Sequence, residues 1–393
     1  MDVTTVNPGK WQGTMTVPPS KSIAHRALIL SALTGGGEIT PIIPSQDMLA
    51  TQDCLKFNGQ YPCRESGSTL RFMIPLALLK SGGGHFTGAG RLAQRPLTPY
   101  EHCLNATFTY AQGEGLDLTV KGELKAGSYT LPGNVSSQFI TGLLLALPFA
   151  EGDSEIRITP PLESKGYIDL TLQAMGDFGL TVHRPDELTF LIPGNQRGES
   201  RDYQVEGDYS QAAVPLCAAA LGSPVTVKGL RPDSRQGDAQ ILPWLEMMGA
   251  QVKWNGGAVT VTAPEGLHGI RTDGGQCPDI MPILALTCAL AQGESRLENL
   301  SRLRIKECDR LAAACEVINL LGGSARIENE GLVIRGQPAL KGGVTAPDYN
   351  DHRMVMMLAA AATRCENPVT IQGADAVSKS WPSFWEDISF LQK

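Results

Sequence analysis

The chain has 393 residues, of which 42% are hydrophobic and 19% charged, and its formal net charge is −7. This length exceeds what one hydrophobic core usually serves, so we expect two domains. The acidic balance argues against general nucleic-acid binding, and the longest apolar runs are far too short to span a membrane. Nine scattered cysteines without a C-x-x-C pair or metal-ligand spacing, and an N-terminus without signal-peptide features, predict a cytoplasmic protein with free thiols.

Six segments along the chain share one pattern, a small polar cluster followed by an Ala- and Leu-rich run. Ser or Asp is a favourable helix N-cap, and apolar residues almost all round a helix predict that it is buried. The regular spacing of the segments, which is 46, 70, 72, 71 and 72 residues, predicts a repeated structural unit. The segments start at Ser20, Ser66, Ser136, Asp208, Asp279 and Asp351.

The same further elements lie between each pair of successive helix starts. A more amphipathic helix follows the buried one, as at 241–250, and a strand–turn–strand follows that helix, as at 251–263. Each unit is therefore roughly β-α-β-α-β-β. Three such units in each half predict an α/β (α+β) fold with two similar pseudo-threefold domains.

We place the domain boundaries between the third and fourth units. One domain is expected at 19–205 and the other at 1–18 with 206–393, joined by a hinge near 18–19 and 205–207.

The first unit is shorter than the others. Its second helix is followed by residues 58–63, which lead directly to the next helix cap at Ser66. By comparison with the period, a hairpin of about 25 residues is missing here. We expect Asn58–Cys63 to be a direct connection without a hairpin. The last unit also lacks a closing hairpin, and the stretch 11–20 offers strand material to the domain of that last unit.

Unusual side chains stand at the helix starts of the N-terminal half. Lys21, Ser22 and Arg26 belong to the first start, where a lysine in the first turn opposes the helix dipole. Such a residue is either a functional group or an ordinary solvated lysine. At the second start, Gly67 allows a ligand to approach the backbone closely, and Arg71 is equally compatible with a structural ion pair.

Two further polar groups follow in this half. Arg91 and Arg95 come after a Gly-rich loop that lacks the GK[ST] sequence of a nucleotide-binding loop. Ser136, Ser137 and Gln138 place hydroxyl and amide groups at the third start. These groups either cap the helix or hydrogen-bond a phosphate or sugar-like ring.

The C-terminal half carries paired acids and bases. Asp279 is either an N-cap or a base that accepts a hydroxyl proton. Residues 304–310 hold five charges, with Lys306, Glu307 and Arg310 spaced to be helical neighbours, and a salt-bridged surface turn is the alternative.

Cations recur at the remaining positions of this half. His352 and Arg353 again oppose a helix dipole, while Lys379 is uninformative alone. A basic cluster within an acidic protein suits a substrate with several phosphate and carboxylate charges. Asp279 and Glu307 would be the acid/base candidates in that setting.

Ten motifs resemble, in order and over essentially the whole chain, the 5-enolpyruvylshikimate-3-phosphate synthase family of enolpyruvyl transferases. They are PPSKSIAHRA, SGSTLR, GRLAQRP, SSQFITGLLLALP, SKGYID, VEGDYSQA, PDIMPILA, RIKECDRL, YNDHRM and SKSWPSF. The resemblance implies two domains of three βαβαββ units that close on the substrates. It also implies transfer of the enolpyruvyl group of phosphoenolpyruvate to the 5-hydroxyl of shikimate 3-phosphate, with release of phosphate, in aromatic amino acid (chorismate) biosynthesis.

The resemblance also implies roles for individual residues. The catalytic group comprises Asp279, which would take the 5-hydroxyl proton, Glu307, which would handle the methylene proton, Lys21 at the junction of both substrates, and His352. The residues expected to bind shikimate 3-phosphate, with Tyr167 nearby, are Ser22, Arg26, Ser136, Ser137, Gln138, Ser164 and Lys306. Those expected to bind phosphoenolpyruvate are Lys21, Gly67, Arg95, Gln138, Arg310, Arg353 and Lys379.

No metal or organic cofactor is implied, nor any partner beyond the two small-molecule substrates; we expect a monomer. Glyphosate, the family's inhibitor, is expected to compete with phosphoenolpyruvate because Gly67 is retained. Besides the missing hairpin, the chain departs from the family pattern at Glu65 and Arg302, where many or some members carry Asn.

Two other functions were weighed against this one. A UDP-N-acetylglucosamine enolpyruvyl transferase has Asn after the first lysine and a cysteine in a mobile loop, so Lys21-Ser22 and the SSQF sequence argue against it. A non-catalytic homologue, impaired by the shortened first unit, is disfavoured by the intact Lys21, Asp279, Glu307 and Lys379.

Overall fold

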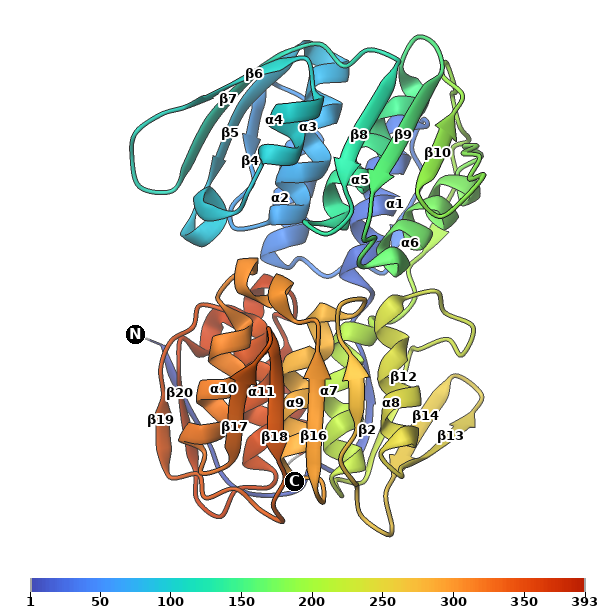
Figure 1. Cartoon of the computed structure of the whole chain (residues 1–393). Helices are drawn as coiled ribbons and strands as arrows, with labels where there is room; N and C mark the ends of the chain where they lie inside the picture. The colour runs from blue at the N-terminus through green and yellow to red at the C-terminus, as the bar shows by residue number, and fades with distance from the viewer. Residues whose placement is uncertain (1, 392–393) are drawn as a thin grey trace. The chain divides into compact units, whose positions relative to one another are not determined.

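The computed structural model describes residues 2–391 and shows a mixed α/β protein (Figure 1). Its internal contacts divide the chain into two compact units, Lys21–Val205 and Met1–Ser20 with Glu206–Lys393. We call these the N-terminal unit and the C-terminal unit. Each unit has its own hydrophobic core. No helix among the described residues is both long enough and apolar enough to cross a membrane.

Three buried helices form the centre of the N-terminal unit: α1 (Lys21–Leu33), α3 (Gly67–Ser81) and α5 (Ser137–Ala146). Smaller helices pack around them, namely α2 (Gln46–Cys54), η1 (Gly90–Gln94), α4 (Thr98–Cys103), η2 (Leu147–Phe149) and α6 (Lys165–Asp177). Because α3 and α5 have almost no polar face, they require cover on all sides.

The sheets of the described N-terminal unit provide part of that cover. One is a four-stranded sheet in the order β4 (Gln60–Pro62), β5 (Gly83–Gly88), β7 (Leu116–Gly122) and β6 (Ala106–Tyr110). A second sheet contains β10 (Thr189–Ile192), β9 (Ser154–Thr159) and β8 (Ser128–Pro132). The third sheet pairs only β11 (Tyr203–Gln204) with β3 (Ile39–Thr40).

The shortened first unit has the predicted form. In the fully described stretch between α2 and α3, the only strand is β4, which pairs in parallel with β5. The prediction that residues 58–63 connect the two helices without a hairpin is therefore confirmed. The strand material expected from residues 11–20 lies in the C-terminal unit, where β2 (Gly13–Thr16) pairs in parallel with β12 (Val225–Lys228).

The C-terminal unit repeats the plan with fuller sheets. Its buried helices are α7 (Tyr209–Ala220), α9 (Met281–Ala289) and α11 (His352–Ala362), which contact one another and are buried along their whole length. The outer helices are η3 (Gly237–Gln240), α8 (Ile241–Met247), η4 (Pro278–Ile280), η5 (Ser301–Ile305), α10 (Arg310–Leu320), η6 (Ala374–Lys379) and α12 (Phe384–Leu391).

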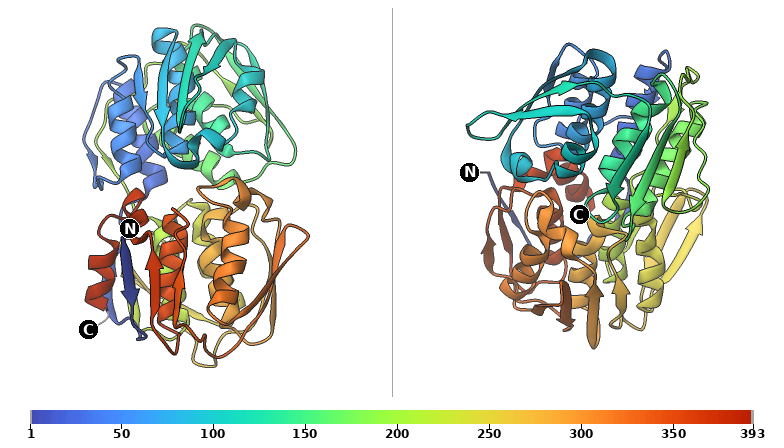
Figure 2. Two further views of the ribbon diagram at one scale, coloured as in Figure 1. Left: turned by 90° about the vertical axis from the view of Figure 1, so that its left-hand side faces the viewer. Right: turned by 45° about the horizontal axis from the view of Figure 1, so that its top comes forward.

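Three sheets accompany these helices in the described part of the unit. Two have four strands: β13 (Gln251–Asn255), β14 (Ala258–Thr262), β12 and β2; and β15 (Arg271–Asp273), β16 (Glu294–Glu298), β18 (Gly331–Arg335) and β17 (Ser324–Glu328). The third joins β1 (Val3–Val6), β20 (Val369–Gln372) and β19 (Val344–Ala346). The N-terminal strand β1 thus lies beside strands from the end of the chain (Figure 2, left).

The chain passes between the units at two points that lie side by side. Pro19 and Gly207 form an antiparallel bridge, the Ser20 amide donates to the Glu206 carbonyl at 2.7 Å, and the Asp208 amide donates to the Pro18 carbonyl at 2.9 Å. The hinge that we expect near these residues stays a prediction.

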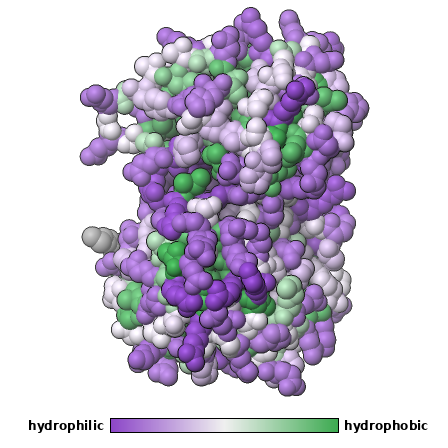
Figure 3. Space-filling view, in the orientation of Figure 1, coloured by the Kyte–Doolittle hydropathy of each residue, from purple (hydrophilic) through white to green (hydrophobic). Residues whose placement is uncertain are grey.

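The surface matches the burial of apolar residues in each unit. The face in Figure 3 is mainly hydrophilic, with hydrophobic residues in separate areas. The exposed large hydrophobic residues are spread along the sequence: Val3, Tyr110, Leu191, Met247, Ile305, Leu320, Ile327 and Phe390.

Candidate active site

Four of the six predicted helix caps are present. Ser66, Ser136, Asp208 and Asp351 each accept a backbone N–H of the following helix through their side chains. Ser20, directly before α1, donates its hydroxyl to Gln236 Oε1 at 2.9 Å. Asp279 lies within η4, and its carboxylate accepts from two cationic side chains. The N-cap interpretation of Asp279 is therefore wrong.

Lys21 is not a solvated lysine. Its Nζ lies 2.7 Å from Asp47 Oδ2 in α2, and only 18% and 14% of the two side chains are exposed. Sequence reasoning missed Asp47, although an acidic residue in the first turn of the next predicted helix was a signal that it could accept from a nearby cation.

Arg26 of α1 is buried and hydrogen-bonds to groups in α1, α5 and α6. Its Nε donates to Thr171 of α6 at 2.8 Å, and its Nη atoms donate to Thr141 of α5 and to the Ser22 and Tyr167 carbonyls. Because burial disfavours its charge, the pKa of Arg26 falls to about 10. Arg26 therefore fixes α1 against α5 and α6 through neutral partners.

Gln138 is held by residues that were not included in the predicted site. Its Oε1 accepts from Arg71 at 2.6 Å, and its Nε2 donates to Ser68 Oγ at 2.8 Å. Arg71 also donates to the Pro96 carbonyl at 3.1 Å, directly after Arg95. Arg71 is therefore a structural arginine that orients Gln138 and the Arg95 segment together.

Gly67 and Arg95 lie against each other. A Cβ atom at Gly67 would fall 2.4 Å from Cζ of Arg95, a separation that real Cβ contacts essentially never show. A side chain at position 67 would therefore require the Arg95 guanidinium to shift. Nearby, the Glu65 carboxylate packs against Gly90 of η1, where a Cβ would lie 2.3 Å from Glu65 Oε2.

The remaining predicted residues of this unit lie at helix starts. Ser137 is buried in the first turn of α5, whereas Ser136 and Ser22 are half-buried. Ser164 is buried directly before α6 and has a left-handed backbone with φ of 55°. Such a backbone is unusual for a residue with a side chain and is typical of positions that function or tight packing imposes.

Arg310 is the centre of the predicted site in the C-terminal unit. Its guanidinium is 2% exposed and donates to Asp279 Oδ1 at 2.9 Å, to Glu307 Oε2 at 2.7 Å and to both oxygens of Asp351 at 2.8 and 3.2 Å. The surface salt-bridge alternative is thus wrong for Arg310. Asp351, which is fully buried, was missed as an arginine partner because it was interpreted only as a cap.

The charges around Asp279 set its protonation. Burial opposes ionisation, but Lys306, Arg310 and Arg353 together hold the pKa of Asp279 well below its ordinary value. Lys306 Nζ lies 3.0 Å from Asp279 Oδ1, and burial lowers the pKa of Lys306. Arg302, which is buried, adds a further positive charge that acts on Lys306.

His352, Arg353 and Lys379 complete this group. His352 Nδ1 is 4.0 Å from Asp351 Oδ1, and Arg353 donates to the Ser210 carbonyl at 2.8 Å. Lys379 Nζ donates to the backbone oxygen of Asn350 at 2.6 Å and to its Oδ1 at 2.8 Å. Asn350 is a further partner that sequence reasoning missed.

No group of three or more His, Cys, Asp or Glu side chains within residues 2–391 is arranged to hold a metal ion. The site groups instead combine buried cations with carboxylates at helix N-termini. Such an arrangement suits the binding of anionic ligands together with proton transfer.

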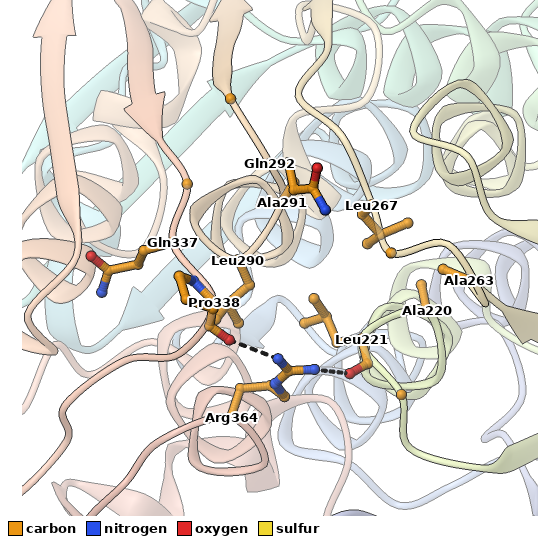
Figure 4. A pocket seen from close by; sticks show the side chains of 14 residues that line it. Ala220, Leu221, Ala263, Leu267, Leu290, Ala291, Gln292, Gln337, Pro338 and Arg364 are labelled. Atoms are coloured by element: carbon orange, nitrogen blue, oxygen red, sulfur yellow. Dashed lines mark hydrogen bonds between the residues drawn. The ribbon is translucent and has the colours of Figure 1, made fainter.

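A cavity of about 580 Å³ lies elsewhere in the C-terminal unit (Figure 4). It is lined by residues at the C-terminal ends of α7 and α9 and by Arg364, which donates to the Leu221 and Pro338 carbonyls. None of the predicted site residues lines it. Because helix C-termini carry partial negative charge, this end of the helices suits anionic substrates less than the N-terminal end does.

The family model for EPSP synthase (3-phosphoshikimate 1-carboxyvinyltransferase) matches residues 6–60 and 57–388. The two matched segments meet in the direct connection between α2 and α3. A protein named 3-phosphoshikimate 1-carboxyvinyltransferase from Clostridium beijerinckii is 42% identical over 98% of this chain and 96% of its own length. That alignment covers 419 positions, so the relative has residues with no counterpart in these 393.

Other relatives and solved structures agree. A Clostridium perfringens protein of the same name is 43% identical over 98% of this chain and 97% of its own length. The EPSP synthase structure from Acinetobacter baumannii superposes with a TM-score of 0.79 at 23% identity, covering 100% of this chain and 98% of that one. The enolpyruvyl transferase NikO from Streptomyces tendae gives 0.80 at 14% identity, with 99% and 97% covered. The structures support the two-domain fold, and the sequence relatives and family model show that this chain belongs to the EPSP synthase family.

Proposed function

We propose that this protein transfers the enolpyruvyl group of phosphoenolpyruvate to the 5-hydroxyl of shikimate 3-phosphate and releases phosphate. The observation that carries the proposal is the identity of 40–43% with relatives named for this activity over nearly the full chain. The site geometry supports it, because Asp279 and Glu307 share one buried guanidinium among several cations.

The proton transfers follow from the carboxylates. Glu307 protonates the methylene carbon of phosphoenolpyruvate, which makes the adjacent carbon electron-poor. Asp279 takes the proton of the 5-hydroxyl, whose oxygen adds to that carbon to give a tetrahedral phospho-intermediate. Glu307 then recovers a proton from the new methyl group as phosphate leaves, which restores the double bond.

The cations stabilise the charges on which these steps depend. In the C-terminal unit we assign Arg310, Arg353 and Lys379 to phosphoenolpyruvate and Lys306 to shikimate 3-phosphate, with His352 assisting. The low pKa of Asp279 means that it is ionised but weakly basic without substrate. Bound phosphate and carboxylate groups offset the surrounding cations and thereby raise its basicity.

In the N-terminal unit we assign the hydroxyl and amide groups to shikimate 3-phosphate. These are Ser22, Ser136, Ser137, Gln138 and Ser164, with Arg26 fixing their helices. Lys21, Gly67 and Arg95 are assigned to phosphoenolpyruvate, with Lys21 shared by both substrates.

A phosphate-release assay with phosphoenolpyruvate and each acceptor tests the proposal. Release that requires shikimate 3-phosphate and is absent with UDP-N-acetylglucosamine is expected. Release only with the nucleotide sugar identifies the other enolpyruvyl transferase, and no release with either acceptor identifies a non-catalytic homologue. We further propose a cytoplasmic monomer, for which light scattering after gel filtration is the check on size.

A further inference from the structure

Two bonds connect α1 to α2, one helical turn apart. The first is the ion pair between Lys21 and Asp47 at 2.7 Å. The second joins His25 Nδ1 to Thr51 Oγ1, also at 2.7 Å. His25 follows Lys21 by four residues and Thr51 follows Asp47 by four, so each pair lies on one helix face. The second bond therefore fixes the register in which Lys21 meets Asp47.

The second bond continues into the start of α3. Thr51 Oγ1 lies 2.8 Å from Thr69 Oγ1, and Thr69 Oγ1 donates to Ser66 Oγ at 2.8 Å. Ser66 is the N-cap of α3, and Gly67, which packs against Arg95, is the first residue of that helix. A buried chain of side chains thus joins the starts of α1, α2 and α3.

The direction of this chain fixes the tautomer of His25. A hydroxyl has only one proton to donate, so Thr69, which donates to Ser66, accepts from Thr51. Thr51 in turn accepts from His25, which therefore carries a proton on Nδ1. Among the described residues, His25 Nε2 is buried without a hydrogen-bond partner. Burial, followed by the charges of Lys21 and Arg26, lowers the pKa of His25, which agrees with a neutral ring.

We propose that His25 is a positioning residue for phosphoenolpyruvate. It acts by holding Lys21 in register with Asp47 and by fixing the N-cap beside Gly67. This inference rests on the proposed function, in which Lys21 and Gly67 contact that substrate. The shikimate 3-phosphate end of α1 is held separately, because Arg26 ties it to α5 and α6.

The kinetic test compares His25→Ala, His25→Asn and a control, His102→Ala, at an exposed histidine of α4 in the same unit. Loss of a buried hydrogen bond at His25→Ala is expected to raise KM for phosphoenolpyruvate about tenfold while changing KM for shikimate 3-phosphate much less. Asn places an amide donor near the position of Nδ1, so His25→Asn should recover most of the affinity. The control should match wild type.

A second test does not depend on activity. The amine of Lys21 is acetylated with a limiting reagent and quantified by mass spectrometry, with Asp47→Asn as the positive control. Labelling of Lys21 should increase in His25→Ala and Asp47→Asn but not in His25→Asn or His102→Ala. If wild type has no turnover, the proposed function fails, while the labelling still decides the role of His25.

The proposal is overturned if His25→Ala equals the control in both KM and labelling, or if His25→Asn is as impaired as His25→Ala. Because Lys21 is assigned to both substrates, the proposal is also overturned if KM for shikimate 3-phosphate rises as much as KM for phosphoenolpyruvate in His25→Ala, since a general structural role predicts that result. Should His25→Ala fail to fold, Thr51→Val and Thr51→Ser decide in its place. Valine removes the hydroxyl at nearly constant volume, so only the valine variant should show the kinetic and labelling effects.

Discussion

Both units place several of their predicted site residues at or near helix N-termini, but the two units hold these residues by different chemistry. In the N-terminal unit, Arg26, Gln138 and His25 bind hydroxyl, amide and carbonyl groups. In the C-terminal unit, Arg310 is surrounded by three carboxylates. Apart from the Lys21–Asp47 ion pair, the N-terminal unit therefore relies on hydrogen bonds to neutral groups, whereas the C-terminal unit balances buried charges. In our proposal, one repeated scaffold thus supports both binding and proton transfer.

The sheets differ as well. The C-terminal unit has described sheets of three, four and four strands, whereas a sheet of the N-terminal unit consists of two strands of two residues each. The helix starts nevertheless keep their caps in both units. These four capped helix starts are thus retained although the hairpin is missing.

The largest expected effect is on the carboxylates of the C-terminal unit. Asp279→Asn and Glu307→Gln should each lower turnover about 10²–10⁴-fold, because each removes a positioned acid or base. Shikimate 3-phosphate affinity should change little, since Lys306 and the N-terminal residues remain. Steady-state rates and isothermal titration check both parts, and nearly wild-type turnover in either variant would rule out its assigned role.

The next largest expected effect is on stability, where the loss of a buried charge should cost more than the loss of a partly exposed one. Asp351→Asn keeps a capping side chain but leaves Arg310 without its fully buried counter-charge, so a loss of about 3–5 kcal/mol in unfolding free energy is expected. Asp47→Asn, at a pair with 18% and 14% exposure, should cost only about 1 kcal/mol.

Urea unfolding can follow the units separately. All five tryptophans belong to the C-terminal unit, so their fluorescence reports the unfolding of that unit, whereas circular dichroism reports the unfolding of both units. The five are Trp11, Trp244, Trp254, Trp381 and Trp385. Equal losses of unfolding free energy in Asp351→Asn and Asp47→Asn would contradict the expected difference between buried and partly exposed charges.

Gly67→Ala should act on the substrate site of the N-terminal unit. The new methyl group collides with the Arg95 guanidinium, so the arginine must shift. We expect KM for phosphoenolpyruvate to rise about tenfold or more, because losing a charge-assisted hydrogen bond weakens binding by about this factor. Glyphosate, which we expect to compete with phosphoenolpyruvate in the wild type, should inhibit less. Gly176→Ala in α6, where an added Cβ meets nothing within 4 Å, serves as the matched control. An unchanged KM in Gly67→Ala would contradict the packing argument.

A smaller difference is expected in local stability. Because the missing hairpin removes cross-strand pairs worth roughly 0.2–1 kcal/mol each, the N-terminal unit should open first. Hydrogen exchange followed by mass spectrometry should show faster exchange in β3 and β11 than in β2 and β12. Earlier opening of residues 206–393 would show that the shortened unit is not a weak point.

The smallest expected effect is that the stabilities of the two units change in opposite directions as pH falls. His25 faces Lys21, Arg26 and Thr51, with Phe72 edge-on at 6.2 Å, and its lowered pKa keeps the folded ring neutral. The unfolded chain takes up a proton below about pH 6.5, so the N-terminal unit should lose stability there. His25→Asn should remove that loss.

Asp238 in the C-terminal unit should behave oppositely. Burial, followed by the charge of Asp279, raises its pKa to about 6 from 3.8, with Ser210 bonded to it and Arg353 and Asp208 nearby. The folded state therefore holds a proton that the unfolded state lacks between these values, and stability should increase as pH falls through this window. Tryptophan-detected unfolding at pH 7.5 and 5.5, compared with Asp238→Asn, checks the sign, and an identical pH dependence in the variant would contradict it.

Much of the fold and site followed from local pattern. The six apolar runs predicted buried helices because helices without a polar face have no stable place at a surface. Cap residues at Ser66, Ser136, Asp208 and Asp351 followed from hydrogen-bonding chemistry. The shortened first unit followed from the period, and the resemblance to known motifs supplied the family.

The failures share one cause, which is that each concerned a partner distant in sequence. Asp47 with Lys21, Asp351 with Arg310 and Asn350 with Lys379 are pairs that no helical spacing links. The strand that β2 pairs with could not be predicted either, because strand pairing depends on which edge is open in three dimensions, and β12 offers that edge.

The sequence by itself determined the repeated helices, the capped starts and the family, since these depend on periodicity and on residues near one another in the chain. Only the tertiary structure decided how the charges are balanced. Arg310 is ionised in the core because three carboxylates converge on it, and Asp279 is a weak base because three cations surround it. Electrostatic energy depends on distance through space and on burial, and neither is written in the order of residues.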